Sequence, residues 1–252
     1  MFIIAEIGLE HCGSEARAKQ LLDRLLATNI DAVTFQIREK EFYDGSHPRK
    51  TELPDDFYRA ALWSAHVQEK QLGFAIAQPK KIDFLSQHGA SFWKTLSWDL
   101  SNNALQTALQ KTGKKIYVST GVSGIEEIEA FNRQYQNIEF IHTTLTDALE
   151  DVNLKAIAAI RQAAGKPVAF GLHSRDPKVM FAALGFEPSA FFFYVKDDTD
   201  GEHPDGPYAL SINEAEKMVN DLKVLAKAIG DGKKVSKTNT LHPADDEICK
   251  SR

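Results

Sequence analysis

Ionisable side chains interrupt or follow the apolar segments of this sequence, and the first segment shows the pattern. Glu6 lies inside the apolar run 2–7, and His11 comes shortly after the glycine that bounds this run. A run of this length that is rich in β-branched residues predicts a buried strand. A buried carboxylate needs a partner because its desolvation is costly. Glu6 and His11 therefore predict a ligand or catalytic site, and the alternative is a core salt bridge with a surface histidine.

Chemically capable residues also end the other apolar runs. They supply two lysines, hydroxyls, amides, a carboxylate and an imidazole, which together can bind an anion and polarise a carbonyl. The candidates at these positions are Gln36, Gln78, Lys94, Ser97, Asp99, Ser119, Gly121, Thr144, His173 and Lys196. Lys94 and His173 adjoin apolar runs, so we expect both to be partly desolvated.

The elements that must position these candidates alternate between apolar runs of strand length and amphipathic segments of helix length. Eight strand and helix pairs are predicted: 2–7 with 16–27, 32–37 with 55–71, 74–77 with 81–88, 92–96 with 102–111, 115–119 with 125–132, 138–143 with 153–164, 167–173 with 178–184, and 190–196 with 212–229. Ser14 is the expected N-cap of the first helix. This alternation predicts an α/β protein with a single (β/α)8 TIM barrel, whose active site would lie at the carboxyl ends of the strands. An open doubly wound sheet is the main alternative, but segment 8–13 lacks the GxGxxG loop common in that fold.

The barrel is expected to occupy residues 1–230, with a polar, poorly ordered C-terminal tail over 231–252. The longest irregular segment, 38–54, follows the second strand. In a barrel it would lie on the active face, where long loops commonly act as lids.

Composition excludes several classes of function. The chain has 252 residues, of which 43% are hydrophobic and 26% charged, and its net charge of -5 with scattered lysines argues against nucleic-acid partners. No apolar run approaches the roughly 18 residues of a membrane span, and the early first strand leaves no room for a signal peptide. Cys12 and Cys249 form no metal or disulfide pattern. We therefore expect a cytoplasmic protein that binds neither nucleic acid nor membrane.

The candidate residues lie in motifs that resemble those of the sialic acid synthase (N-acetylneuraminate synthase) family. IIAEIGLEHCG resembles the family's IIAEIGxNHxG, and TGKKIYVSTGVSGIEEIEAF resembles its TGKPxxxSTGMxxxxEI. WKTLSWDL resembles KIxSGEL or KIxSxDL, LGFAIAQP stands where the family has GxxFxSTP, and DAVTFQ stands where it has DAVKFQ. The likeness keeps the same order over residues 2–230.

This resemblance implies a (β/α)8 transferase of carbohydrate biosynthesis. Family members condense phosphoenolpyruvate with an N-acetylated aldose, usually with a divalent metal such as Mn²⁺ or Mg²⁺, to give a 2-keto sugar acid. The partners implied are a small anionic substrate and a sugar. The catalytic candidates are Glu6, Lys94 and Asp99, the substrate-binding candidates are Gln36, Gln78, Ser97, Ser119, Gly121 and Thr144, and the candidate metal ligand is His173.

The sequence departs from the family pattern at both charged sites. Thr34 replaces a lysine of the anion site, which removes one cation unless His11, Arg38 or Lys196 turns inward. The second metal histidine is missing, and one imidazole alone rarely holds a divalent ion. Further ligands could come from the following loop, at Asp200, His203 or Asp205, while Tyr194 or Lys196 lies where the histidine is expected. The chain also ends where the family's small antifreeze-like domain would begin. The sequence leaves open whether the protein forms a homodimer.

Two classes of function follow. The first is a divergent synthase that condenses phosphoenolpyruvate with an aldose or another aldehyde to give a 2-keto-3-deoxy sugar acid. The second is a barrel that has lost this chemistry, either a Schiff-base lyase or aldolase that uses Lys94 or Lys196, or a noncatalytic subunit. The missing cation predicts weaker phosphoenolpyruvate binding in which Lys94 dominates.

Overall fold

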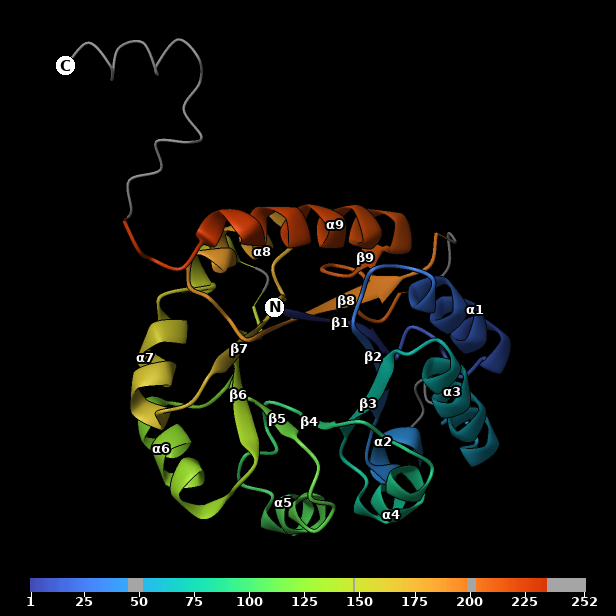
Figure 1. The fold of residues 1–252 in the computed structure, drawn as a ribbon. Coiled ribbons are helices and arrows are strands. Elements are labelled where there is room, and N and C mark those ends of the chain that lie inside the picture. The colour runs from blue at the N-terminus through green and yellow to red at the C-terminus, as the bar shows by residue number, and fades with distance from the viewer. Residues whose placement is uncertain (45–51, 147, 199–202, 235–252) are drawn as a thin grey trace, which may run out of the picture.

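The computed structural model describes residues 1–44, 52–146, 148–198 and 203–234. Within these residues, eight parallel strands pair in sequence order, and the pairing of β1 with β8 closes them into a ring (Figure 1). The strands of the ring are β1 (Phe2–Gly8), β2 (Ala32–Ile37), β3 (Gln71–Ile76), β4 (Trp93–Thr95), β5 (Ile116–Ser119), β6 (Ile138–His142), β7 (Val168–Gly171) and β8 (Ala190–Lys196). A further short strand, β9 (Leu210–Ser211), pairs with β8 outside the ring.

Helices cover the outside of the ring (Figure 1). They are α1 (Glu15–Leu26), α2 (Lys40–Asp44), α3 (Asp55–Val67), α4 (Pro79–Gln87), α5 (Asn103–Gln110), α6 (Ile125–Gln134), α7 (Ala156–Ala164), α8 (Lys178–Leu184) and α9 (Ile212–Ile229), together with the 3₁₀ helix η1 (Leu149–Asp151). Ser14 caps α1 by accepting a hydrogen bond from the backbone N–H of Arg17. The predicted (β/α)8 barrel and this N-cap are confirmed.

Strand alternation divides the core into two layers. Side chains that face the helices form the large outer core, as Ile3, Ala5 and Ile7 of β1 do. The alternate side chains fill the barrel interior and form a second cluster: Ile4, Ala32, Phe92, Tyr117, Ile141, Ala169, Ala190 and Phe192. Because successive residues of a strand point to opposite faces, the next inward position of β1 after Ile4 is Glu6. The register of the barrel therefore directs the Glu6 carboxylate toward the carboxyl end of the interior.

The structure corrects two local predictions. The helix predicted over 55–71 ends at Val67, and residue 71 begins β3. Segment 38–54 is not irregular throughout, because residues 40–44 form α2. Residues 45–51 of this segment lie outside the described residues, as does the tail from 235 onward, so the lid and the disorder of the tail stay predictions. The α9 helix ends at Ile229, close to the expected barrel boundary.

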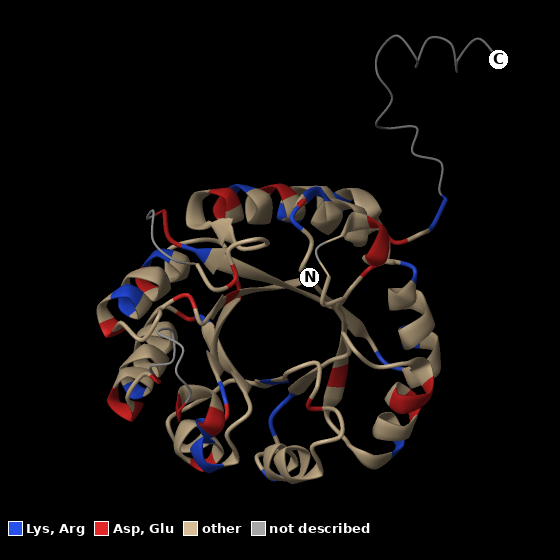
Figure 2. Cartoon of the chain, turned by 180° about the vertical axis from the view of Figure 1, so that it is seen from behind, with Lys and Arg blue, Asp and Glu red and all other residues tan. Residues whose placement is uncertain are grey.

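Charged residues of both signs are interspersed along the outer helices (Figure 2). Among the described residues, no helix combines the length and the apolar character that a bilayer crossing requires.

Candidate active site

A cavity of about 680 Å³ opens at the carboxyl ends of the strands. Seven polar or aromatic residues of the lining belong to strands or follow a strand within two residues: Gln36, Arg38, Lys94, Ser97, Ser119, His173 and Tyr194. Nine further residues complete the wall: Leu9, Leu96, Trp98, Leu145, Thr146, Pro204, Asp205, Pro207 and Tyr208. The cavity therefore lies where active sites of this fold occur.

Lys94 and Glu6 form a buried ion pair at the cavity. The Nζ atom of Lys94 lies 2.6 Å from Oε1 and 2.5 Å from Oε2 of Glu6, and both side chains are almost fully buried. The hydroxyl of Thr34 donates a longer hydrogen bond, of 3.4 Å, to Oε2 of Glu6. The rings of Phe192 and Tyr194 lie 5.4 and 5.5 Å from the ammonium. Opposite charges with hydrogen bonds are what make burial of two ions tolerable.

A pair of serines and a glycine form a compact group beside this ion pair. The Ser97 and Ser119 hydroxyls lie 2.9 Å apart, and the backbone N–H of Gly121 donates to Ser97 Oγ over 3.2 Å. A Cβ at position 121 would lie 2.7 Å from Ser97 Oγ, so only glycine fits this close approach. Ser97 and Ser119 both line the cavity, and a hydroxyl can donate a hydrogen bond to an anion.

His173 also lines the cavity and packs against two tyrosine rings. Its Nδ1 atom is 2.6 Å from the Thr143 hydroxyl, and its ring packs against Tyr208 at 4.9 Å and Tyr194 at 5.6 Å between centroids. Burial, with a smaller effect from the positive charge of Lys94, lowers the pKa of His173 to about 3. The imidazole is therefore neutral at pH 7 and can donate or accept one hydrogen bond at each nitrogen.

Asp205 is the acidic residue of the cavity lining. Its Oδ1 accepts a 3.2 Å hydrogen bond from the Tyr208 hydroxyl, and Oδ2 is buried with no hydrogen-bond partner among the described residues. Burial, followed by repulsion from Glu10, raises the pKa of Asp205 to about 7. A Cβ on Gly8 would lie 2.8 Å from Asp205 Oδ2, so this glycine makes room for the carboxylate.

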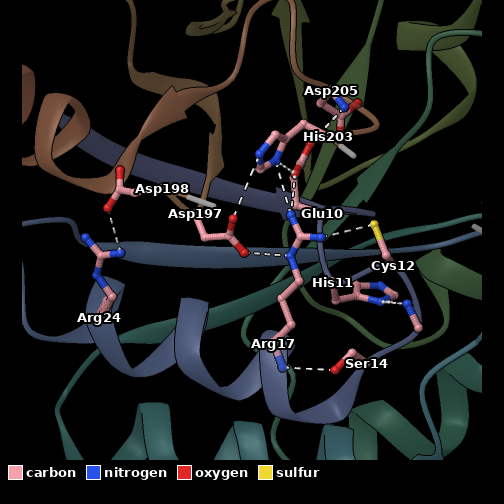
Figure 3. Close-up of polar contacts among 11 residues, drawn as sticks. Glu10, His11, Cys12, Ser14, Arg17, Arg24, Asp197, Asp198, His203 and Asp205 are labelled. Carbon is pink, nitrogen blue, oxygen red and sulfur yellow. Dashed lines mark hydrogen bonds and ion pairs between the residues drawn. The ribbon is translucent and has the colours of Figure 1, made fainter. Parts of the chain in front are cut away.

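A polar network holds the loop that carries Asp205 against the start of α1 (Figure 3). The fully buried Glu10 accepts a 2.8 Å hydrogen bond from the backbone N–H of Asp205, and its Oε2 lies 2.7 Å from Nδ1 of His203. Arg17 lies 3.5 Å from Glu10 Oε2 and pairs with Asp197 at 2.6 Å. These contacts join the segment after β1 to the segment after β8.

The predicted site residues divide into two groups by position. Gln36, Lys94, Ser97, Ser119 and His173 line the cavity, and Glu6 touches it through Lys94. The other predicted residues, Asp99, Gln78, Gly121 and Thr144, are not among its lining residues. Their assigned roles in substrate binding or catalysis stay predictions, as do those of the first group.

Two of the predicted residues outside the lining make local structural contacts. The Gln78 amide donates to the carbonyl of Arg38 over 3.0 Å and lies 3.4 Å from Glu52. Asp99 accepts a 3.3 Å hydrogen bond from Asn102, and burial raises its pKa. Neither orientation can be read from residue type alone.

Sequence reasoning did not single out Trp98 and Tyr208 as lining residues. Trp98 stands directly between two candidates, Ser97 and Asp99, which is the signal that could have identified it. Tyr208 follows a Pro-Asp-Gly-Pro turn outside any predicted element, and its position depends on how this loop folds back over the barrel. His11, in contrast, does not line the cavity; burial lowers its pKa to about 4, so it carries no positive charge at neutral pH.

The described residues do not fit a complete divalent metal site. They contain no group of three or more His, Cys, Asp or Glu side chains arranged to hold an ion. His173 bonds Thr143 through one nitrogen, and Lys196 donates from Nζ to the carbonyl of Gly206. Asp200, one of the expected compensating ligands, lies outside the described residues. A lysine that donates a hydrogen bond cannot serve as a metal ligand in place of histidine.

The fold and the cavity define a class: a (β/α)8 barrel with two cationic side chains and paired hydroxyls at the active-site end. The chain belongs to the NeuB family, whose model matches residues 19–234.

The names of similar proteins agree with membership of this family. The chain is 26% identical to the N,N'-diacetyllegionaminic acid synthase of Campylobacter jejuni, over 94% of this chain and 80% of that protein. It is 24% identical to the N-acetylneuraminate-9-phosphate synthase of Homo sapiens, over 97% of this chain and 74% of that one. The solved N-acetylneuraminic acid (sialic acid) synthetase of Leptospira borgpetersenii has the same fold, with a TM-score of 0.87 and 20% identity over 100% of this chain and 90% of that chain. At the level of the family, the chain is therefore an enzyme of the synthase class.

Proposed function

We propose that this protein condenses phosphoenolpyruvate with an aldose or another aldehyde to form a 2-keto-3-deoxy sugar acid. In this reaction the methylene carbon of phosphoenolpyruvate bonds to the aldehyde carbon, whose oxygen gains a proton and becomes a hydroxyl. Water adds to the carbon that carries the phosphate, and inorganic phosphate leaves. One molecule of each substrate and one water give one keto acid and one phosphate.

The observation that carries this proposal is the Lys94–Glu6 pair beside the Ser97 and Ser119 hydroxyls. An ammonium and two hydroxyls can bind the oxygens of phosphate or carboxylate. Glu6 keeps Lys94 oriented by holding it through both carboxylate oxygens. We assign Lys94, Ser97 and Ser119 to the donor anion, and Glu6 to proton transfer or to orientation of Lys94.

We assign the acceptor to His173, Tyr208 and Gln36, which also line the cavity. An amide, a phenol and a neutral imidazole can hydrogen-bond sugar hydroxyls without adding a second charge. Aromatic rings offer apolar faces against which a sugar ring packs. The acceptor of this chain need not match that of any one relative, because the substrates named for the relatives already differ.

The geometry supports the synthase over a Schiff-base lyase. An imine-forming amine needs a free lone pair. Lys94 instead lies within hydrogen-bond distance of both oxygens of a carboxylate, and Lys196 does not line the cavity. Borohydride trapping with a keto acid distinguishes the two functions, because only the lyase leaves an adduct on a lysine.

The first prediction concerns Lys94. We expect Lys94→Ala to abolish detectable phosphoenolpyruvate binding and Lys94→Arg to retain part of it. Thr34→Lys should strengthen binding about tenfold to a hundredfold, because a hydrogen bond to a charged group contributes roughly 1.5–3 kcal/mol. Isothermal titration of each variant measures the affinity. Lys115→Ala is the matched control, because Lys115 pairs with Glu139 near the amino ends of β5 and β6, away from the cavity.

Removal of Lys94 alone leaves Glu6 buried without its cation, so misfolding must be separated from lost binding. The paired variant Glu6→Gln with Lys94→Met keeps both side chains close to their original size and removes both charges. A folded double variant that still binds phosphoenolpyruvate as tightly as the unsubstituted protein would contradict the assignment. Release of phosphate that depends on an added aldose, with formation of a 2-keto acid, tests the reaction itself. Absence of this release across a panel of N-acetylated and plain aldoses would overturn the proposed function.

A further inference from the structure

Arg38 lies at the cavity in a position that a motif comparison does not reveal. It follows β2 directly, four residues after Thr34, and its side chain lines the cavity that Lys94 also lines. We propose that Arg38 is the second anion-binding cation of this site and supplies the positive charge that Thr34 does not. This inference rests on the proposed function, since it assigns a ligand to the phosphate or carboxylate of the donor.

The backbone of Arg38 is held in place from both sides. Its N–H donates to the Tyr43 hydroxyl over 3.0 Å, and its carbonyl accepts from the Gln78 amide over 3.0 Å. Tyr43 belongs to α2, and Gln78 is the N-cap residue of α4. The residue is therefore positioned by two separate elements, which reduces the conformational freedom that binding would otherwise have to remove.

Two aromatic rings hold the guanidinium. Its central carbon lies 4.2 Å from the ring centroid of Phe42 and 5.3 Å from that of Trp98. A guanidinium is planar and weakly hydrated, so it stacks on aromatic faces more readily than an ammonium does. Trp98 itself lines the cavity. The Arg38 side chain is only 16% exposed, although it lies at the rim.

The present partner of Arg38 leaves part of the guanidinium for a ligand. Nε donates to Glu39 over 3.0 Å and Nη2 over 2.8 Å, which uses one N–H of each nitrogen. A guanidinium has five N–H donors, so three form no hydrogen bond with the described part of the chain. Glu39 is 39% exposed, and water screens such a pair. A phosphate can therefore bind the remaining donors or displace Glu39.

The balance of charge also favours this assignment. Glu6 already neutralises Lys94, and the Asp205 carboxyl adds negative charge when it ionises. Phosphoenolpyruvate brings two acidic groups, a phosphate and a carboxylate. Arg38 is the other cation that lines the cavity within the part of the chain that the structure describes. Two anionic groups of the donor are thus matched by two cationic side chains of the lining, Lys94 and Arg38.

The second prediction tests this inference by moving the cation. We expect Arg38→Ala to weaken phosphoenolpyruvate binding about tenfold to a hundredfold and Arg38→Lys to weaken it less, in keeping with loss of a charged hydrogen bond. Adding Thr34→Lys to Arg38→Ala should restore most of the lost affinity. Glu39→Gln should leave binding unchanged or tighter. Titration calorimetry gives the affinities, and tryptophan fluorescence gives an independent signal because the guanidinium lies beside Trp98.

Arg24→Ala is the matched control, since Arg24 pairs with Asp198 on the outside of the barrel. Its phosphoenolpyruvate affinity should equal that of the unsubstituted protein. If Arg38→Ala unfolds at the same temperature as the unsubstituted protein and binds phosphoenolpyruvate with unchanged affinity, the inference is overturned while the proposed function stays intact. If the unsubstituted protein binds inorganic phosphate but not phosphoenolpyruvate, and Arg38→Ala loses the phosphate, then the role of Arg38 is supported and the proposed donor is wrong. If the unsubstituted protein binds neither anion, both proposals fail.

Discussion

Asp205 holds its proton more tightly than an exposed aspartate does, because burial and the nearby Glu10 carboxylate raise its pKa to about 7. Below about pH 4 the carboxyl is protonated in both the folded and the unfolded chain. Between about pH 4 and 7 the folded chain keeps a proton that the unfolded chain has lost. The free energy of unfolding therefore falls as the pH rises through this window.

The third prediction follows from that sign. An asparagine at position 205 cannot ionise, so Asp205→Asn should not lose stability as the pH rises. At pH 8 its free energy of unfolding should exceed that of the unsubstituted protein by at most about 4 kcal/mol. Near pH 4 the two proteins should be equally stable. Urea unfolding at several pH values measures this difference. Asp23→Asn is the control, because Asp23 is exposed and pairs only with Lys19 among the described residues. An equal gain at pH 4 and pH 8 would show that the Asp205 proton is not its cause.

The fourth prediction concerns metal at His173. Because the described residues form no complete site, we expect weak or no binding of Mn²⁺ and Zn²⁺ to the unsubstituted protein, with any bound ion lost in His173→Ala. Calorimetric titration of both proteins with each ion measures this. Tight binding that persists in His173→Ala would place the ligands elsewhere in the chain.

Residue types predicted part of the site. Glu6 and Lys94 are 88 residues apart in sequence. Each side chain faces the barrel interior near the carboxyl end of its strand, so closure of the barrel brings the two together. The same reasoning does not give the direction of a side chain that follows a strand. Arg38 turns toward the cavity because Phe42 and Trp98 hold it there, while Gln78 turns to the Arg38 carbonyl. These contacts depend on loop folding, which residue spacing does not encode.

At the scale of elements, one fully buried residue, Glu10, holds the segment after β8 in place. Glu10 accepts a hydrogen bond from the Asp205 backbone and contacts His203 and Arg17, and it is fully buried. The segment supplies Pro204, Asp205, Pro207 and Tyr208 to the cavity wall. Loss of Glu10 should therefore loosen this wall while the barrel stays closed.

The fifth prediction is that Glu10→Ala lowers the free energy of unfolding by about 3–5 kcal/mol, as expected when one partner of a buried pair is removed. Hydrogen exchange should also accelerate selectively over residues 203–209. Glu10→Gln should retain more of both properties, because an amide oxygen can still accept from Asp205. Glu15→Gln, at the exposed start of α1, serves as the control. Uniform acceleration across β1 to β8 would mean that Glu10 supports the whole fold and not this segment.

The elements themselves were predictable in type and order. Apolar strands that alternate with amphipathic helices carry a strong signal because both periods are set by backbone geometry. The short elements α2 and β9 escaped prediction for a physical reason. Five residues of α2 bury no side chain, and β9 exists because it pairs with β8, so neither has a periodic apolar pattern of its own.

At the scale of the molecule, the closed barrel follows from the unbroken eightfold repeat, and the family match over residues 19–234 agrees with it. The sequence left three candidates for the compensating cation, His11, Arg38 and Lys196, because the direction of the Arg38 side chain depends on Trp98, which lies far away in sequence. Each of the eight strand and helix repeats along the chain specifies the same barrel architecture. The cavity wall is assembled from the loops after several strands and is specified only by the contacts of these loops.

The pairing of β1 with β8 also fixes the order in which the molecule can be assembled. Residues 2–6 pair with residues 190–194, so the strand that carries Glu6 has one edge unpaired until the last strand of the ring exists. During synthesis from the amino terminus, the earlier strands can pair with one another, but the ring and its cavity form only after β8 has emerged from the ribosome. Contacts so distant in sequence slow folding. An unpaired β1 edge can meanwhile pair with other chains, which makes the interval before closure the time of greatest risk of aggregation.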